Sequence, residues 1–305
     1  MLPNHLSSLA LGTAPFGTGI SREQSFQLLD AYVQSGGNLL DTAAVYGMGA
    51  SEQTVGDWMR KRNARNKVTV ATKGGHPSLS DWSSRITEKE IRADIEASLR
   101  NLQTDHADIF FLHRDDETQP VQNIMPVLDR LVREGKTRYI GASNWTAARI
   151  NEANAFAREN GMAQFAVSQI FWCGASINKQ GVYDQTLVCM DDTEHAAYAQ
   201  NHIPVMAYTS QARGLFSLIQ SQGVDALPED MKRTYLNAQT LKRAERIREI
   251  SQKTGISPTA VSLAYLLYDP EIKAYPILGT SRPERIARVM QLFALSTQDI
   301  AFLFS

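Results

Sequence analysis

Four residues of types that can move a proton occur within the first 113 positions of the chain. Asp41 ends the apolar stretch NLLD, and Tyr46 follows five residues later; Lys73 ends KVTVATK, and His113 ends ADIFFLH. A nearby ammonium group favours a phenolate and lowers the pKa of a tyrosine by about 1 to 3 units. A carboxylate beside that lysine keeps it charged when it is partly buried. Together the four residues predict proton transfer from Tyr46 to a carbonyl oxygen that His113 orients.

Taken singly, each of these residues has an ordinary structural explanation. A lysine or an aspartate at a strand end is commonly a solvated rim residue, and a lone histidine is commonly a structural one. The spacing favours chemistry, because three successive apolar stretches end in such a residue. Proton transfer also needs a bond change, and two remain open: hydride delivery by a nicotinamide cofactor, or Schiff-base chemistry of an aldolase at Lys73.

Eight short apolar stretches, separated by amphipathic helical patterns, must position these residues. The predicted strands cover residues 9–13, 38–43, 67–73, 107–113, 137–143, 164–169, 203–209 and 274–280. Their apolar character is nearly continuous, as in parallel strands that are covered on both faces. Helix N-caps are expected at Ser21, Thr87, Thr146 and Ser257, and Glu90 would complete a capping box with Thr87.

Eight βα units in this chain predict an α/β fold, a closed (β/α)8 TIM barrel. We expect residues 1–305 to form a single barrel domain with long loops after strands six and seven, at about 172–192 and 210–236. Loops of this length are usually functional or partly helical. Active sites of such barrels lie at the carboxyl ends of the strands, where the proton-transfer residues are predicted to meet.

Composition and charge exclude several classes of protein. A net charge of -1 with 21% charged residues gives no basic surface for nucleic acid. No stretch approaches the ~20 apolar residues of a membrane span, and no signal segment is visible, so we expect a cytoplasmic protein without a membrane partner. Cys173 and Cys189 lack metal-binding spacing, and the acidic run at 115–117 is better explained as a solvated loop, so no metal site is predicted. The oligomeric state cannot be read from the sequence.

The usual nucleotide-binding motifs are absent from the sequence. No GxGxxG follows a predicted strand and no GxxxxGK[ST] occurs. A barrel can instead hold phosphate with its last loops and a helix N-terminus. The stretch LGTSRPERI offers Gly279 for close approach, Ser281 as a cap, and the positive charges of Arg282 and Arg285.

Polar side chains at three other strand ends suit a nicotinamide ring. Ser143 and Asn144 end the fifth predicted strand, and Gln169 ends the sixth. Their hydroxyl and amide groups can bind a carboxamide, and Tyr208 at the end of the seventh offers a flat face for stacking.

Several motifs, in order along residues 11–290, resemble the aldo-keto reductase family. They are LGTAPFG, LLDTAAVYG, the lysine of VATKGG, FFLHRDD, GASN, the glutamine of VSQ, VMAYTSQARGLF and ILGTSRPERI. The resemblance implies a TIM barrel that binds NADP(H) without a Rossmann fold and reversibly reduces an aldehyde or ketone. It implies that Asp41, Tyr46, Lys73 and His113 are the catalytic residues, with Tyr46 as the proton donor.

The resemblance also implies a set of cofactor contacts. These are Gly12, Thr13, Asp41, Ser143, Asn144, Gln169, Tyr208, Thr209, Ser210, Gln211, Gly214, Gly279, Thr280, Ser281, Arg282 and Arg285. Two of them, Arg282 and Arg285, can meet a 2′-phosphate, so we expect NADP(H) rather than NAD(H). Val289 departs from the family pattern, since many members carry an asparagine or an acidic residue there.

The substrate pocket is expected to be shaped by the loops after strands three, four and six. Trp82, Arg114 and Trp172 are the predicted substrate contacts. This mixture of aromatic and charged groups favours a small-molecule carbonyl that is polar or sugar-like. A different hypothesis is a nucleotide-sensing binding protein with vestigial activity.

Overall fold

Eight parallel strands form a closed barrel in which each strand pairs with the next along the chain and β8 pairs with β1. The computed structural model describes residues 2–305. The strands are β1 (Ala10–Gly12), β2 (Leu39–Asp41), β3 (Thr69–Gly74), β4 (Ala107–Leu112), β5 (Thr137–Ser143), β6 (Phe165–Phe171), β7 (Val205–Tyr208) and β8 (Ala274–Leu278). The predicted (β/α)8 barrel is confirmed, and all eight strands lie where the sequence pattern placed them.

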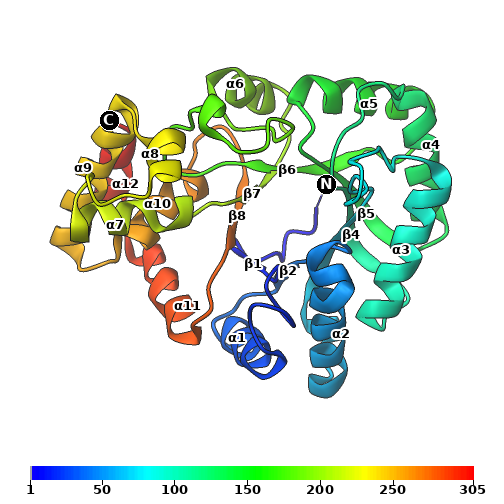
Figure 1. Ribbon diagram of the computed structural model, residues 1–305, viewed down its shortest axis with the longest axis horizontal. Helices are drawn as coiled ribbons and strands as arrows, with labels where there is room; N and C mark the ends of the chain where they lie inside the picture. Colours follow the sequence, from blue (N-terminus) through cyan, green and yellow to red (C-terminus); the bar gives the residue numbers. More distant parts are fainter. Residues whose placement is uncertain (1) are drawn as a thin grey trace.

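Helices surround the strands, and α7 to α12 gather on one side of the barrel (Figure 1). They are α1 (Arg22–Gln34), α2 (Ala50–Arg62), α3 (Glu88–Leu102), α4 (Val121–Arg133), α5 (Ala147–Glu159), α6 (Asp192–Gln200), α7 (Leu215–Gln222), α8 (Glu229–Tyr235), α9 (Ala238–Thr254), α10 (Pro258–Leu267), α11 (Pro283–Met290) and α12 (Thr297–Phe304). No helix within residues 2–305 is long and apolar enough to cross a membrane.

The predicted helix caps are present, with one difference in detail. Ser21, Thr87, Thr146 and Ser257 each accept a backbone N–H from the first turn of their helix. The capping box at Thr87 is wrong, because Glu90 accepts a hydrogen bond from the Thr87 hydroxyl rather than from its backbone N–H. The reciprocal box forms at Ser21 instead, with Gln24.

Two apolar cores explain why the strands read as nearly continuous hydrophobic stretches. One core fills the inside of the barrel and includes Leu39, Ile109, Phe111 and Met206. The other packs the outer faces of the strands against the helices. Because both faces of each strand are covered, polar residues are tolerated chiefly at the strand ends.

The two long loops are partly helical, as their length indicated. The loop after β6 contains a short 3-10 helix, Lys179–Gly181, and is held to the end of that strand by a bridge between Phe171 and Cys189. The loop after β7 carries α7 and α8. Both loops lie at the carboxyl ends of the strands and therefore border the mouth of the barrel.

Candidate active site

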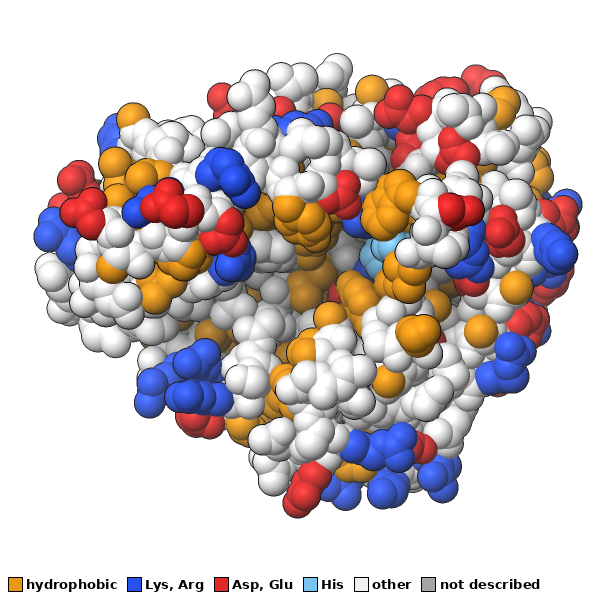
Figure 2. Space-filling model, viewed as in Figure 1, with side chains coloured by type: hydrophobic (Ala, Val, Ile, Leu, Met, Phe, Trp, Pro, Cys, Tyr) orange, Lys and Arg blue, Asp and Glu red, His pale blue; other side chains and the backbone are white. Residues whose placement is uncertain are grey.

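The carboxyl ends of the strands surround a cavity of about 960 Å³. Figure 2 shows the hollow at the centre of this face, with a histidine and several hydrophobic side chains around it. Most of the predicted site residues line it: Gly12, Asp41, Tyr46, His113, Arg114, Ser143, Asn144, Gln169, Tyr208, Thr209, Ser210, Gln211, Gly214, Gly279 and Arg285.

Three neighbouring strands bring the predicted proton-transfer residues together. Asp41 is the last residue of β2, Lys73 lies near the end of β3, and His113 directly follows β4. These strands pair in the order β2, β3, β4, so their ends are adjacent. Tyr46 begins a short 3-10 helix whose next residue, Gly47, has a φ of 55°, a conformation that suits glycine.

The ammonium group of Lys73 donates hydrogen bonds to three oxygen atoms. Its Nζ donates to Asp41 Oδ1 and to the carbonyl oxygen of Thr42, each at 2.8 Å, and to the Tyr46 hydroxyl at 3.2 Å. Burial alone would lower the pKa of Lys73, but the charges and hydrogen bonds of Asp41 and Tyr46 outweigh it and raise that pKa. Lys73 is therefore a buried ammonium group beneath the cavity, and it is charged at neutral pH.

The predicted lowering of the Tyr46 pKa is wrong for this structure. Burial of the hydroxyl raises the pKa above its ordinary value of 10.0, and the charge of Lys73 offsets only part of that increase. The Asp41 carboxylate acts in the same direction as burial. Tyr46 is consequently protonated at neutral pH and available as an acid, with a cation already beside its oxygen.

His113 is a neutral imidazole in this environment. Burial lowers its pKa well below 6.5, and the charges of Lys73, Arg114 and His76 act in the same direction. Its ring meets the Tyr46 ring edge-on, with centroids 5.9 Å apart and planes at 83°. A neutral imidazole carries one N–H, so His113 can donate a single hydrogen bond to a group in the cavity.

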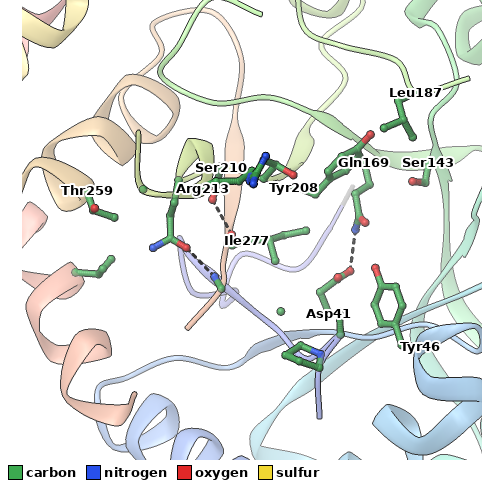
Figure 3. Close-up of a pocket in the computed structure, with 18 of the residues that line it drawn as sticks. Asp41, Tyr46, Ser143, Gln169, Leu187, Tyr208, Ser210, Arg213, Thr259 and Ile277 are labelled. Atoms are coloured by element: carbon green, nitrogen blue, oxygen red, sulfur yellow. Dashed lines mark hydrogen bonds between the residues drawn. The ribbon is translucent and has the colours of Figure 1, made fainter. Parts of the chain in front are cut away.

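Amide side chains from the opposite strands complete this part of the site. Gln169 Nε2 donates to Asp41 Oδ1 at 2.8 Å, which links β6 to β2 across the mouth (Figure 3). Asn144, directly after β5, accepts a hydrogen bond from the Tyr208 hydroxyl at 2.7 Å. The hydroxyl, amide and aromatic groups predicted to face a nicotinamide ring therefore lie on one wall.

The loop after β7 is fastened to the end of β8. Ser210 Oγ donates to the carbonyl oxygen of Ile277 at 2.6 Å, and the backbone N–H of Gly279 donates to Gln211 Oε1 at 2.8 Å. Thr209 and Gly214 line the same stretch. This part of the cavity continues to Arg285 and Arg288 on α11.

Six predicted contact residues lie outside the lining of this cavity: Trp82 borders the neighbouring cavity described below, and the other five lie elsewhere. Thr13 is buried beneath it, where its hydroxyl donates to the Asp41 carbonyl oxygen at 2.9 Å. Thr280, Ser281 and Arg282 form the turn before α11, and the Thr280 hydroxyl bonds the Arg282 carbonyl oxygen within that turn. Trp172 packs against His195, with ring centroids 6.2 Å apart, in a separate cavity beside α6 and α9. Contacts of these residues with a bound cofactor or substrate stay predictions.

A second cavity of about 370 Å³ adjoins the first and lies among the loops after β3, β4 and β6. Trp82 lines it, and Arg114 lines both cavities. The Arg114 guanidinium lies 3.3 Å from Asp184, which ties the loop after β4 to the loop after β6. Two of the three predicted substrate contacts thus border the site.

Two lining residues, His76 and Arg288, carried no clear signal in the sequence. His76 lies two residues beyond β3. Tyr183, in the long loop after β6, also lines the cavity, with 89% of its surface exposed. Arg288 lies one helical turn after Arg285, a spacing that places both on one side of α11. The i, i+3 relation could have indicated Arg288 once the helix start was known.

The model of the aldo/keto reductase family matches residues 8–303. The chain belongs to this family. It is 29% identical to a norsolorinic acid reductase of Aspergillus flavus over 95% of this chain and 74% of that protein. It is 28% identical to an aryl-alcohol dehydrogenase of Pestalotiopsis microspora, over 98% and 77% of the two chains. Norsolorinic acid reductase B of Aspergillus parasiticus is 30% identical, over 88% and 80%.

The Lys73–Asp41 pair predicts a specific pattern of stability in this reductase. Lys73→Met leaves the Asp41 carboxylate buried without its cation, and we expect a loss of about 3 to 5 kcal/mol in the free energy of unfolding. Adding Asp41→Asn removes the unpaired charge, so the double variant should be more stable than Lys73→Met alone. Urea unfolding of the three proteins measures this. A double variant no more stable than the single one would contradict the assigned role of the Asp41 charge.

Proposed function

We propose that this aldo/keto reductase reduces an aldehyde or ketone with NADP(H), and that Tyr46 donates the proton. One observation carries the proposal: the Tyr46 hydroxyl lines the cavity and accepts a hydrogen bond from the buried Lys73 ammonium group. Reduction of a carbonyl by the family supports the reaction class. The roles of the individual residues rest on their geometry.

The proton-transfer step follows from the charges beside Tyr46. When its proton moves to a carbonyl oxygen, a phenolate forms 3.2 Å from a fixed ammonium group, which stabilises the new negative charge. Asp41 keeps that ammonium in place and is itself held by Gln169. His113, neutral and on the same cavity wall, donates a hydrogen bond that orients the carbonyl oxygen.

The cavity fits an extended dinucleotide. It runs from Tyr46 past Asn144 and Tyr208 to Arg288, a path with amide groups at one end and positive charge at the other. Asn144, Ser143 and Gln169 would hold the carboxamide, Tyr208 would cover the ring, and residues 209–214 would lie along the diphosphate. When bound, NADP(H) supplies the hydride for the carbonyl carbon. Figure 2 shows Lys and Arg side chains on the side of the hollow where α11 lies, which favours a 2′-phosphate there.

Two other functions receive less support from the geometry. A Schiff-base aldolase needs a free amine that reaches the substrate, whereas Lys73 is charged, fully hydrogen-bonded and beneath the lining. A nucleotide-sensing protein with vestigial activity would not need a charged Lys73 held beside the Tyr46 hydroxyl. Tight NADPH binding by the wild type without turnover of any aldehyde or ketone would favour that second function.

Tyr46→Phe tests the proton donor. We expect kcat for aldehyde reduction to fall by about 100- to 10,000-fold, because the general acid is lost while the ring is kept. Affinity for NADPH, measured by fluorescence, should stay the same. Tyr183→Phe is the matched control, since that tyrosine also lines the cavity but is mostly exposed. Full activity of Tyr46→Phe would show that another group gives the proton.

The pKa directions predict a broad pH plateau for the reduction. Tyr46 must be protonated, and its pKa is raised above 10.0, so it is competent at every pH below that value. His113 must be neutral, and its pKa lies well below 6.5, so it is competent at every pH above that value. We expect kcat/KM for reduction to stay constant between about pH 6.5 and 10. A titration with a midpoint inside this window would contradict the assignment.

The arginines of α11 predict the cofactor preference. Arg288→Leu should weaken NADPH binding by about tenfold or more and leave NADH binding nearly unchanged, because only NADPH carries the 2′-phosphate. Arg282→Leu is the control, since Arg282 precedes the same helix but lies outside the lining. Dissociation constants for both cofactors measure the effect. Equal losses for NADPH and NADH in Arg288→Leu would place the adenosine end elsewhere.

A further inference from the structure

A ladder of four aromatic rings connects Tyr46 to the surface. The Tyr46 and His113 rings meet edge-on, and His113 meets His76 with centroids 4.9 Å apart and planes at 81°. His76 in turn meets Trp82 at 5.6 Å and 87°. His76 and His113 line the same cavity, so His76 is the next ring that a molecule bound at His113 would meet.

The hydrogen bonding of His76 determines which of its nitrogens is free. Its Nδ1 lies 2.8 Å from the carbonyl oxygen of Pro77, and a carbonyl can only accept, so Nδ1 carries the proton. Burial lowers the pKa of His76, and the charges of Arg114 and Arg85 lower it further, which keeps the ring neutral at pH 7. Nε2 therefore has a free lone pair.

No group in residues 2–305 donates a hydrogen bond to His76 Nε2, and that atom is not sealed inside the protein. The cavity thus contains a fixed acceptor whose partner must come from solvent or from a ligand. The rings of His113 and Trp82 pack on His76 edge-on, and the bond to Pro77 sets its rotation. An acceptor held in this way favours ligands that carry a hydrogen-bond donor over ligands that lack one.

We propose that His76 is a specificity-determining residue that accepts a hydrogen bond from a substrate hydroxyl close to the carbonyl group. The proposal rests on the proposed function, in which His113 and Tyr46 bind the carbonyl oxygen. With the two histidine rings 4.9 Å apart on one wall, a molecule whose carbonyl is at His113 brings a hydroxyl on the adjoining carbon towards His76. The substrate class is therefore a hydroxylated aldehyde or ketone.

A methyl group in place of that hydroxyl would leave Nε2 desolvated and without a partner. Such a loss costs more than the net gain from a typical hydrogen bond, so the acceptor discriminates against apolar analogues. Lactaldehyde and 2-methylpropanal form a suitable pair of probes, because they differ by a hydroxyl and a methyl group on the carbon next to the carbonyl. Both enantiomers of lactaldehyde are tested, and concentrations are corrected for hydration of the aldehydes.

Two substitutions separate the hydrogen bond from the packing. His76→Phe keeps a ring between His113 and Trp82 but removes both nitrogens, whereas His76→Gln restores an oxygen acceptor without the ring. The measured quantity is the ratio of kcat/KM for lactaldehyde to kcat/KM for 2-methylpropanal, with NADPH saturating. Comparing this ratio between variants cancels intrinsic differences in reactivity of the two aldehydes.

We expect His76→Phe to lower the ratio by about 3- to 30-fold, chiefly through lactaldehyde, and His76→Gln to recover part of it. An unchanged ratio in His76→Phe, or equal losses for both aldehydes, would overturn the proposal. So would a ratio in His76→Gln as low as in His76→Phe. If the wild type reduced 2-methylpropanal or other carbonyl compounds but not lactaldehyde, this assignment alone would be overturned, whereas no turnover of any aldehyde or ketone would overturn the proposed function as well.

Discussion

The buried ammonium group of Lys73 is the constraint on which the site depends. A lysine with no exposed side-chain surface is tolerated only if its charge is paired and its hydrogens find acceptors. Those acceptors are Asp41, the carbonyl oxygen of Thr42 and the hydroxyl of Tyr46, all at or just beyond the end of β2. One cation on β3 thus contacts the end of β2 and the segment that follows it as far as Tyr46. Gln169 extends the network to the far side of the barrel.

The same charge separates the protonation states of two neighbouring groups. It opposes the effect of burial on Tyr46 only in part, so the hydroxyl keeps its proton in the resting site. It also adds to the effect of burial on His113, so the imidazole stays neutral. An acid and a neutral hydrogen-bond donor therefore face one cavity over the same range of pH. The sequence indicated that Lys73 acts on Tyr46, but the balance between its charge and burial needs the packed structure.

The strands and the proton-transfer site could be predicted, because they follow from local sequence patterns and from a general rule of the barrel fold. Apolar stretches gave the strands, and the rule that active sites lie at strand ends brought Asp41, Lys73 and His113 together. Positions that depend on the direction of a side chain or the path of a loop could not be read from the sequence. Arg282 precedes α11 and is absent from the lining of the cavity that Arg288 borders, and Trp172, directly after β6, borders a separate cavity beside α6 and α9. His76 was missed because one histidine in a loop has no distinguishing pattern.

The strand ends hold the groups beside Tyr46, and the loops hold the side chains that border the rest of the cavity. The contacts of Lys73 run to residues at or just after the end of β2, whereas His76 and Arg114 are held by contacts within and between loops. Loops tolerate substitution better than the elements they connect. Changes in the loops after β3, β4 and β6 can therefore alter which carbonyl compound is accepted without disturbing the groups beside Tyr46. Relatives that share the barrel and differ in these loops are then expected to share the reaction and differ in substrate.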